Sequence, residues 1–253
     1  KQKLTKFSDI DAKCHQFTML HKGKTAKQLA DEFGIKLNGK KDACQRLVIK
    51  MFGSDAKSIN RVKDFSEIGL TAKTITLTSE GEKTEDMKMF QIDFDEWCNT
   101  ETTFDEQIDS PESHYSEAYS FFTEQSFLFI IFEEPYKGKK IPIEKCKFKG
   151  FKRYSFQESF INEDVRKTWN EVRRLVFTKE LKEEKSNRGY APNFPKMKDN
   201  LFFVRGSGKD SSVKKPHLEK WGIDIKMYVQ WAWVKGEYIV SQFIDIVSYN
   251  YNV

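Results

Sequence analysis

The sequence predicts an α/β (α+β) domain in which a mixed sheet is flanked by helices, and three observations lead to this class. Residues 1–60 carry helical patterns. Residues 70–78 alternate in the manner of a strand, and the run FLFIIF at residues 127–132 has the length of a strand. From Asn162 onward, apolar residues recur at helical spacing. This order of helices, sheet, long helix and further strands favours one domain of the α/β or α+β class.

Two early helices are predicted from their ends and their apolar sides. The tetrapeptide TAKQ at residues 25–28 is a capping box, and Gly34 stands where a helix commonly ends in a left-handed residue. Residues 42–52 form a second helix with apolar residues on one side.

The middle of the chain is predicted to build the sheet. Residues 70–78 are rich in β-branched side chains, and we expect residues 87–92 to be their partner strand. Residues 93–117 are acidic and polar, which is typical of a long surface excursion. The run at 127–132 is apolar on both faces and therefore predicts a central strand, followed by another strand at 146–156.

The last part of the chain is predicted to contain a long helix and further strands. Asn162 is a suitable N-cap for the long helix. Residues 201–205 and 226–234 indicate strands, and residues 238–246 indicate a closing helix. We therefore expect one domain.

The predicted domain spans residues 1–253, with a helical part at 1–60 and a sheet core with the C-terminal part at 61–253. Hydrophobic residues make up 38% of the 253 residues, and the 22 phenylalanines help to fill a core, so the chain is predicted to fold. No apolar run approaches the ~20 residues that span a bilayer. Because the chain begins with Lys1 and not Met, we expect a fragment of a longer protein.

Four scattered cysteines form no CxxC pair, which favours reduced thiols and a cytoplasmic location over disulfides or zinc. They are Cys14, Cys44, Cys98 and Cys146.

Charge is distributed unevenly along the chain, although the net charge is only +5. Residues 1–63 contain 15 Lys and Arg against 6 Asp and Glu, and residues 137–153 contain 8 bases against 1 acid. Residues 78–117 contain 13 acids against 2 lysines. Basic segments favour a polyanionic partner, of which nucleic acid is the commonest, while the alternative is a solvated lysine-rich surface.

The segment KDFSEIGLTAKTITL at residues 63–77 has the spacing of a metal-dependent nuclease motif, Asp-x6-Glu-x-Lys. Asp64 and Lys73 occupy the first and last positions, but Thr71 stands where the motif has its second acid.

The chain resembles MutH and the GATC-specific Type II restriction endonucleases related to it, above all the C-terminal module of two-module enzymes. The resemblance covers roughly residues 11–243. It rests on the order of six segments: GKTAKQLADEFGI, KDFSEIGLTAKTITL, FLFIIF, INEDVRKTWNEV, LFFVRG and WVKGEYIVSQF. It implies a restriction-endonuclease-like fold of the PD-(D/E)xK, MutH-like type, and a site-specific deoxyribonuclease as the parent enzyme.

The resemblance implies that active members bind Mg²⁺ through a helix glutamate, the aspartate and the second glutamate. In this chain the helix glutamate falls on Ile49 and the second glutamate on Thr71, while Asp64 and Lys73 remain. We therefore expect no catalytic residue and no metal in this module, with Mg²⁺ serving a catalytic module elsewhere. The alternative for Asp64 and Lys73 is an ion pair at a strand edge.

Two further alternatives keep a metal in the chain. Glu67 or Asp86 would substitute for the missing acids in an active endonuclease. A displaced site would use Glu85, Asp86, Asp93 and Asp95, although solvated loop acids are the commoner case.

The resemblance places DNA contacts at Arg205, Ser207, Lys209, Trp233, Lys235 and Lys41. Arginine pairs bidentately with guanine O6 and N7, so Arg205 is the expected base reader. Family members have Arg-Pro where this chain has Arg205-Gly206, and a lysine where Ser207 lies, so we expect a looser loop. Trp233 is expected at a thymine methyl or a sugar, or alternatively in the core, and Lys235 and Lys41 at phosphates.

Three functions follow. The first is an allosteric effector module that binds double-stranded GATC DNA and promotes cleavage by a catalytic module of the same chain, with a dimer on DNA left open. The second is an active Mg²⁺-dependent endonuclease. The third is a protein-interaction or dimerisation domain, which the acidic residues 78–117 favour.

Overall fold

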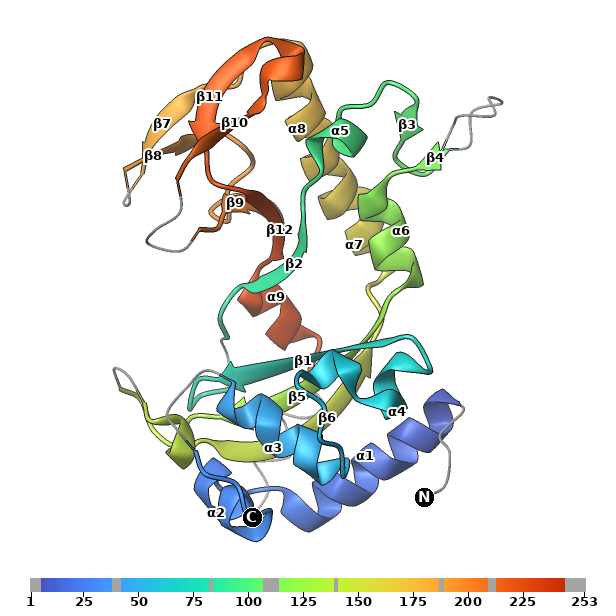
Figure 1. The fold of residues 1–253 in the computed structure, drawn as a ribbon, viewed down its shortest axis with the longest axis vertical. Helices are drawn as coiled ribbons and strands as arrows, with labels where there is room; N and C mark the ends of the chain where they lie inside the picture. The colour runs from blue at the N-terminus through green and yellow to red at the C-terminus, as the bar shows by residue number, and fades with distance from the viewer. Residues whose placement is uncertain are drawn as a thin grey trace. The chain divides into compact units, whose positions relative to one another are not determined.

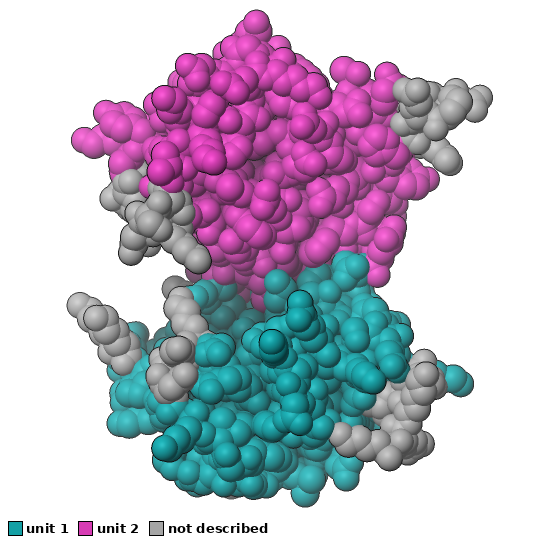
Figure 2. Space-filling model, viewed as in Figure 1, with its two compact units in different colours: residues 1–85, 125–155, 239–253 teal, residues 86–124, 156–238 magenta. Residues whose placement is uncertain are grey.

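The computed structural model describes residues 6–37, 42–81, 84–106, 114–138, 141–186, 189–208 and 213–243. The chain divides into two compact units, coloured teal and magenta in Figure 2. Unit 1 comprises residues 1–85, 125–155 and 239–253, and unit 2 comprises residues 86–124 and 156–238. The single domain predicted over residues 1–253 stays a prediction, with its two main sheets assigned to different units.

Unit 1 is a mixed three-stranded sheet with helices against it. Its strand order is β1-β5-β6, in which β1 is parallel to β5 and β5 is antiparallel to β6. The elements are α1 (Phe7–His21), α2 (Ala26–Glu32), α3 (Ala43–Met51), α4 (Lys63–Ser66), β1 (Leu70–Leu77), β5 (Ser126–Glu133) and β6 (Lys147–Tyr154), with 3-10 turns at Ile59–Arg61 and Ile143–Lys145. The predicted α/β class with a mixed sheet flanked by helices is confirmed, and it is compatible with a restriction-endonuclease-like fold.

Local sequence signals account for the elements of unit 1. The Thr25 hydroxyl accepts from the N–H of Gln28, and the Gln28 side chain accepts from the N–H of Thr25, which is the predicted capping box. Gly34 ends this helical segment at φ +64°. The six residues at 127–132 are all buried, as expected for the central strand β5.

Helices α1, α2 and α3 lie along one face of the β1-β5-β6 sheet (Figure 1). The apolar sides of these three helices form one core with that face of the sheet, and each helix buries its apolar residues there. On β5, Leu128, Ile130 and Phe132 belong to this core, while Phe129 faces the other way and contacts Phe243 with ring centroids 5.1 Å apart.

Unit 2 combines a second sheet, two short hairpins and a long helix. A three-stranded sheet has the order β2-β12-β9, and both pairings are antiparallel. The elements are β2 (Met87–Gln91), α5 (Phe94–Trp97), β3 (Thr102–Thr103), β4 (His114–Tyr115), α6 (Glu117–Glu124), α7 (Glu158–Phe160), a π-helical stretch (Ile161–Val165), α8 (Arg166–Phe177), β7 (Glu183–Ser186), β8 (Gly189–Pro192), β9 (Phe202–Gly206), β10 (Lys215–Leu218), a 3-10 turn (Glu219–Trp221), β11 (Ile223–Met227) and β12 (Gln230–Val234). Helix α9 (Gly236–Ser241) begins in unit 2 and ends in unit 1, because the boundary between the units follows Tyr238.

The predicted pairing of residues 87–92 with residues 70–78 is wrong. β2 pairs with β12, some 140 residues later, rather than with β1. Alternation identifies a strand but carries no information about its partner, because pairing in a sheet is decided by tertiary packing.

The prediction that the acidic region 93–117 is a surface excursion is also wrong in part. It contains α5 and two short strands, and Trp97 and Phe104 are buried. Arg173 on α8 donates from Nη1 to the carbonyl oxygens of Trp97 and Asn99, at 2.6 and 2.8 Å. Buried aromatic residues and this arginine fix the region to α8.

Three boundaries also differ from those predicted. The long helical segment begins at α7, so Asn162 lies inside it and is not its N-cap; its Oδ1 accepts from Arg166, 3.4 Å away. The strand predicted at 226–234 is two strands, because the chain leaves the β10-β11 pair and enters the β2-β12-β9 sheet at Tyr228. The closing helix is α9, and residues 244–246 of its predicted range lie outside the described residues.

None of the helices in the described part of the chain combines the length and apolar character that crossing a bilayer demands. All four cysteines are buried free thiols.

Candidate nucleic-acid interface

The four positions of the nuclease motif all lie in unit 1, but they do not converge. Side chains alternate along a strand, so Thr71 and Lys73 lie on one face of β1 while Leu70 and Ala72 lie on the other. Ile49 on α3 packs in the same core as Leu70 and Ala72, which is the opposite face of the strand from Thr71 and Lys73.

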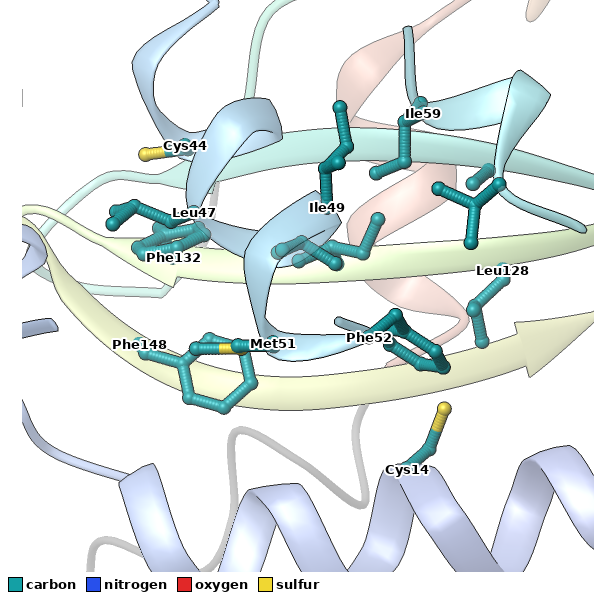
Figure 3. Close-up of a cluster of buried hydrophobic side chains, with 14 of the residues drawn as sticks. Cys14, Cys44, Leu47, Ile49, Met51, Phe52, Ile59, Leu128, Phe132 and Phe148 are labelled. Atoms are coloured by element: carbon teal, nitrogen blue, oxygen red, sulfur yellow. The ribbon is translucent and has the colours of Figure 1, made fainter. Parts of the chain in front are cut away.

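Ile49 is a core residue. Its exposed fraction is 4%, and Figure 3 shows it among the apolar side chains of α3 and the sheet, with Leu47, Phe52 and Phe132 labelled near it. A carboxylate at this position would lie in an apolar environment.

Asp64 is bound to a lysine that the sequence analysis did not identify. Its Oδ2 accepts from Nζ of Lys13 at 2.6 Å, and both side chains are about a quarter exposed, 27% each. The Lys13 ammonium also lies 4.8 Å from the ring centroid of Phe52. Asp64 lies on α4 and not at a strand edge, where the alternative interpretation placed its ion pair. Its partner Lys13 lies 51 residues earlier in the chain, so no local signal in the sequence indicates this pair.

Thr71 takes part in a structural hydrogen bond. Its hydroxyl donates to the amide oxygen of Gln125 at 2.9 Å, and the next residue, Ala72, donates its N–H to Oδ1 of Asn60 at 2.7 Å. These two contacts join the start of β1 to the residue before β5 and to the turn before α4. The Thr71 side chain therefore has a role in holding the sheet together.

The residues at the motif positions do not fit a Mg²⁺ ion. Mg²⁺ requires oxygen ligands, usually carboxylates, in near-octahedral geometry. Here Ile49 has no ligand atom, Thr71 is neutral, and the Asp64 carboxylate is already neutralised by Lys13. Within the described ranges, no group of three or more His, Cys, Asp or Glu side chains is arranged to hold a metal ion.

The acids considered as substitutes are engaged in other contacts. Asp93 is the N-cap of α5, where its side chain accepts from the N–H of Asp95. Asp95 in turn pairs with Lys220 at 3.0 Å. Asp86 accepts from Gly236 through Oδ1 and from an arginine through Oδ2. These contacts are typical of acids with structural roles.

Unit 2 brings several of the predicted DNA-binding residues together on one face of the β2-β12-β9 sheet. Gln230, Ala232 and Val234 of β12 are buried, so Trp231 and Trp233 point to the other side. Arg205 lies opposite Trp231, and Phe203 opposite Trp233. We call this side, with Lys88, Phe203, Arg205, Trp231 and Trp233, the Arg205 face.

Lys88 reaches the Arg205 face because of a β-bulge. Trp233 lies opposite Lys88, but Trp231 lies opposite Gln91, so β2 has one residue more than β12 between these two pairs. The extra residue places both Lys88 and Gln91 on the side of the tryptophans. The sequence analysis missed Lys88, since a bulge interrupts the alternation that would have revealed it.

Arg205 is held on several sides and remains accessible. Its side chain is 42% exposed, and Nη2 donates to Oδ2 of Asp86 at 2.8 Å. The guanidinium lies 5.0 Å from the ring centroid of Trp233 and 4.8 Å from that of Phe203. Both ring contacts are within the range of cation–π attraction. The arginine is thus oriented before any ligand arrives.

Trp233 is half-buried and belongs to the Arg205 face, which differs from the alternative that it packs in the core. Its indole Nε1 donates to the carbonyl oxygen of Arg205 at 3.3 Å. One edge of the ring is therefore tied to the neighbouring strand, and the ring supports the Arg205 guanidinium.

The segment after Arg205 is bound to the sheet as far as Ser207. Gly206 lies opposite Gln230 in the ladder, and the N–H of Ser207 donates to the carbonyl oxygen of Val229. A Cβ on Gly206 would meet Gln230 Nε2 at 3.0 Å and Tyr228 Cβ at 3.3 Å, which explains a glycine here. These two residues are therefore anchored to the sheet, and the expectation that the loop is looser than in relatives stays a prediction.

Of the other residues predicted to contact DNA, the structure describes Lys235 and Ser207. Lys235 follows β12 and lies 3.4 Å from Glu237, with 26% of its side chain exposed. Ser207 accepts a hydrogen bond from Nζ of Lys88 at 3.1 Å. Lys41 and Lys209 lie outside the described residues.

Comparison with known proteins shows a likeness to a restriction enzyme. The Type II restriction enzyme Sau3AI of Staphylococcus aureus is 25% identical over 248 residues, which cover 87% of this chain and 48% of that enzyme. The chain thus spans about half the length of this relative. No protein-family model matches. The likeness supports a distant relationship to a Type II restriction enzyme.

Proposed function

We propose that this chain is a DNA-binding effector module of a Type II restriction endonuclease, specific for GATC, that does not itself cut DNA. The observation that carries the proposal is the Arg205 face, where an oriented arginine, a lysine and two tryptophans gather on one sheet. The distant likeness to Sau3AI supports DNA as the partner.

Base reading would centre on Arg205. Its guanidinium would donate to O6 and N7 of a guanine in the major groove. Asp86 and Trp233 restrict its rotamers, so less conformational entropy would be lost on binding. Trp233 would lie against a thymine methyl or a sugar, and Ser207 and Lys209 beside it in the groove. Lys235 and Lys41 would contact phosphates.

The proposed lack of cleavage rests on unit 1. Two of the three metal-binding acids are replaced, by Ile49 and Thr71, and the third is paired with Lys13. Mg²⁺ would serve a separate catalytic, MutH-like module of the full-length enzyme. For DNA bound here to promote cleavage there, the DNA must bind the cleavage-competent arrangement more tightly than the idle one.

A binding experiment tests this function. A 20-base-pair duplex with one central GATC and a scrambled duplex of the same composition would be titrated with the chain, with and without Mg²⁺. We expect tighter binding to the GATC duplex under both conditions and no nicked product. Equal affinity for the two duplexes would contradict the proposal.

The acid and the lysine of the motif that this chain retains, Asp64 and Lys73, favour a second candidate, an active endonuclease with acids recruited from elsewhere. Such an enzyme would nick the GATC duplex in Mg²⁺, and Asp64→Asn would abolish nicking. A third candidate, a protein-interaction or dimerisation domain, predicts no salt-dependent affinity for either duplex.

A further inference from the structure

Lys88 has a defined position on the Arg205 face. Its Nζ lies 3.4 Å from the ring centroid of Trp231, which places the ammonium directly over the indole. The same Nζ donates to the Ser207 hydroxyl at 3.1 Å. An ammonium held by an aromatic face and a hydroxyl is far more restricted than that of an ordinary surface lysine, whose four-carbon stem is flexible.

The environment of Lys88 differs from that of a lysine at the rim of an interface. Its side chain is half-buried, and loss of hydration lowers the pKa of its ammonium. Lysines that contact phosphates gain most of their effect from an exposed, mobile charge. A partly desolvated ammonium at a fixed place favours a partner that is itself fixed and accepts hydrogen bonds.

Lys88 and the proposed base reader, Arg205, have neighbouring residues in common. Trp231, beneath its ammonium, is the residue opposite Arg205 in the β9-β12 ladder. Ser207, which accepts its hydrogen bond, is two residues after Arg205. Asp86, two residues before Lys88 on the same segment, binds the Arg205 guanidinium. One stretch of chain, residues 86–88, therefore supplies a carboxylate to Arg205 and a second cation beside it.

We propose that Lys88 is a second base-reading residue, whose ammonium donates to a guanine O6 or N7 acceptor in the major groove. This inference rests on the proposed function. Lysine, like arginine, is suited to these two acceptors, and GATC offers one guanine on each strand, so Arg205 and Lys88 would each have a guanine. Trp231 and Ser207 are positioning residues that hold the ammonium.

The test compares Lys88→Met with wild type on the GATC and scrambled duplexes over a range of salt concentrations. Lys220→Met is the matched control, because it removes one positive charge from unit 2 at an exposed lysine bound to Asp95. We expect Lys88→Met to weaken GATC binding roughly 5- to 100-fold, to change scrambled binding little, and to leave the salt slope almost unchanged. Lys220→Met should change neither.

A second measurement uses a duplex in which 7-deazaguanine replaces both guanines of GATC, which removes the N7 acceptors. Wild type and Lys220→Met should lose the same affinity. A smaller loss by Lys88→Met would identify N7 as the acceptor of Lys88, and an equal loss would identify O6. Lys88→Arg, which keeps the charge, should retain scrambled binding, and circular dichroism would verify that each variant is folded.

The outcomes separate the two proposals. If wild type does not prefer GATC, the proposed function fails, and the role of Lys88 fails with it. If wild type prefers GATC and Lys88→Met keeps the full preference, only the role of Lys88 is overturned. If Lys88→Met weakens both duplexes equally and lowers the salt slope by about 1, Lys88 contacts a phosphate, and base reading by Lys88 is overturned.

Discussion

Arg205 combines a full positive charge with a restricted geometry. Asp86 accepts from one end of the guanidinium, and two aromatic rings lie within 5.0 Å of its centre. A lysine in the same place would keep the charge but lose the planar, forked arrangement of donors. The contacts on this single residue therefore matter for base recognition more than for general attraction to DNA.

This leads to a prediction for Arg205→Lys. Binding to GATC should weaken by about 1–3 kcal/mol, because the bidentate pair with guanine is lost, while binding to a scrambled duplex should hardly change. Fluorescence anisotropy at a fixed salt concentration measures both affinities. Arg174→Lys, at an exposed arginine on α8 that pairs with Glu171, is the control. Equal weakening on both duplexes would assign Arg205 to the phosphate backbone.

Ile49 shows why the glutamate that the MutH-like resemblance implies at this position should not create a metal site here. A glutamate here would be buried in an apolar core without a partner, so Ile49→Glu should destabilise the protein by roughly 3–5 kcal/mol. Ile49→Val should cost only about 0.5–1.5 kcal/mol. Urea unfolding followed by circular dichroism measures both. Mg²⁺-dependent nicking by the double variant Ile49→Glu, Thr71→Glu would contradict the geometry described for β1.

At the scale of elements, helix α5 contains a carboxyl in an unusual state. Burial raises the pKa of the Glu96 carboxyl to about 7, and the hydrogen bond from the N–H of Glu117 to Oε1 only partly offsets this. Oε2 is buried and meets no hydrogen-bond donor within the described ranges. Burial also raises the pKa of Glu117, so both carboxyls act in the same direction.

The pH dependence of stability follows from the raised pKa of Glu96. Its folded pKa of about 7 exceeds the ordinary unfolded value of about 4.3, so its contribution to stability is complete below about pH 4 and is lost as the pH rises through 7. Glu96→Gln should therefore be more stable than wild type at pH 8, by about 1–2 kcal/mol once solvent screening of the partly exposed carboxyl is allowed for, and similar at pH 4.5. Urea titrations at the two pH values measure this, with the exposed Glu101→Gln as control. A constant difference between the two pH values would refute the assignment.

Sequence reasoning succeeded where the signal is local and failed where it is not. The capping box depends only on Thr25 and Gln28, and β5 depends on a short run of apolar residues. Because these signals lie within the elements themselves, both elements form as predicted. The partner of β2, the burial of Trp97 and the pairing of Lys13 with Asp64 depend on contacts between distant segments. Of the candidate site, the sequence analysis named Arg205 and Trp233. The place of Lys88 on the Arg205 face, and of Asp86 beside Arg205, follows only from the contacts between distant strands.

At the scale of the whole molecule, the positions that the MutH-like resemblance assigns to metal binding and the residues proposed to read bases belong to different units. The metal positions belong to unit 1, where Ile49 and Thr71 now support the core and the sheet. The Arg205 face is built within unit 2, from its own three strands. Under the proposed function, the absence of acids at Ile49 and Thr71 in unit 1 need not disturb the residues of unit 2 that are proposed to read bases.

If the chain is part of the proposed two-module enzyme, that enzyme offers the decisive prediction at this scale. Arg205→Ala in this module should lower the rate of GATC cleavage, because the module would no longer hold the DNA that favours the competent arrangement. Asp64→Asn combined with Lys73→Met should leave the rate unchanged, because neither residue would act in catalysis. Cleavage of a labelled plasmid measures both rates.

A short, uncleavable GATC duplex added in trans gives this experiment its control. It should stimulate cleavage by wild type and by the Asp64→Asn, Lys73→Met variant, but not by Arg205→Ala, because only Arg205→Ala would fail to bind it. The stimulation should saturate at the duplex concentration that fills the module in direct binding, since coupling between two sites is reciprocal. A strong loss of cleavage in the Asp64→Asn, Lys73→Met variant would instead identify unit 1 as a working nuclease centre.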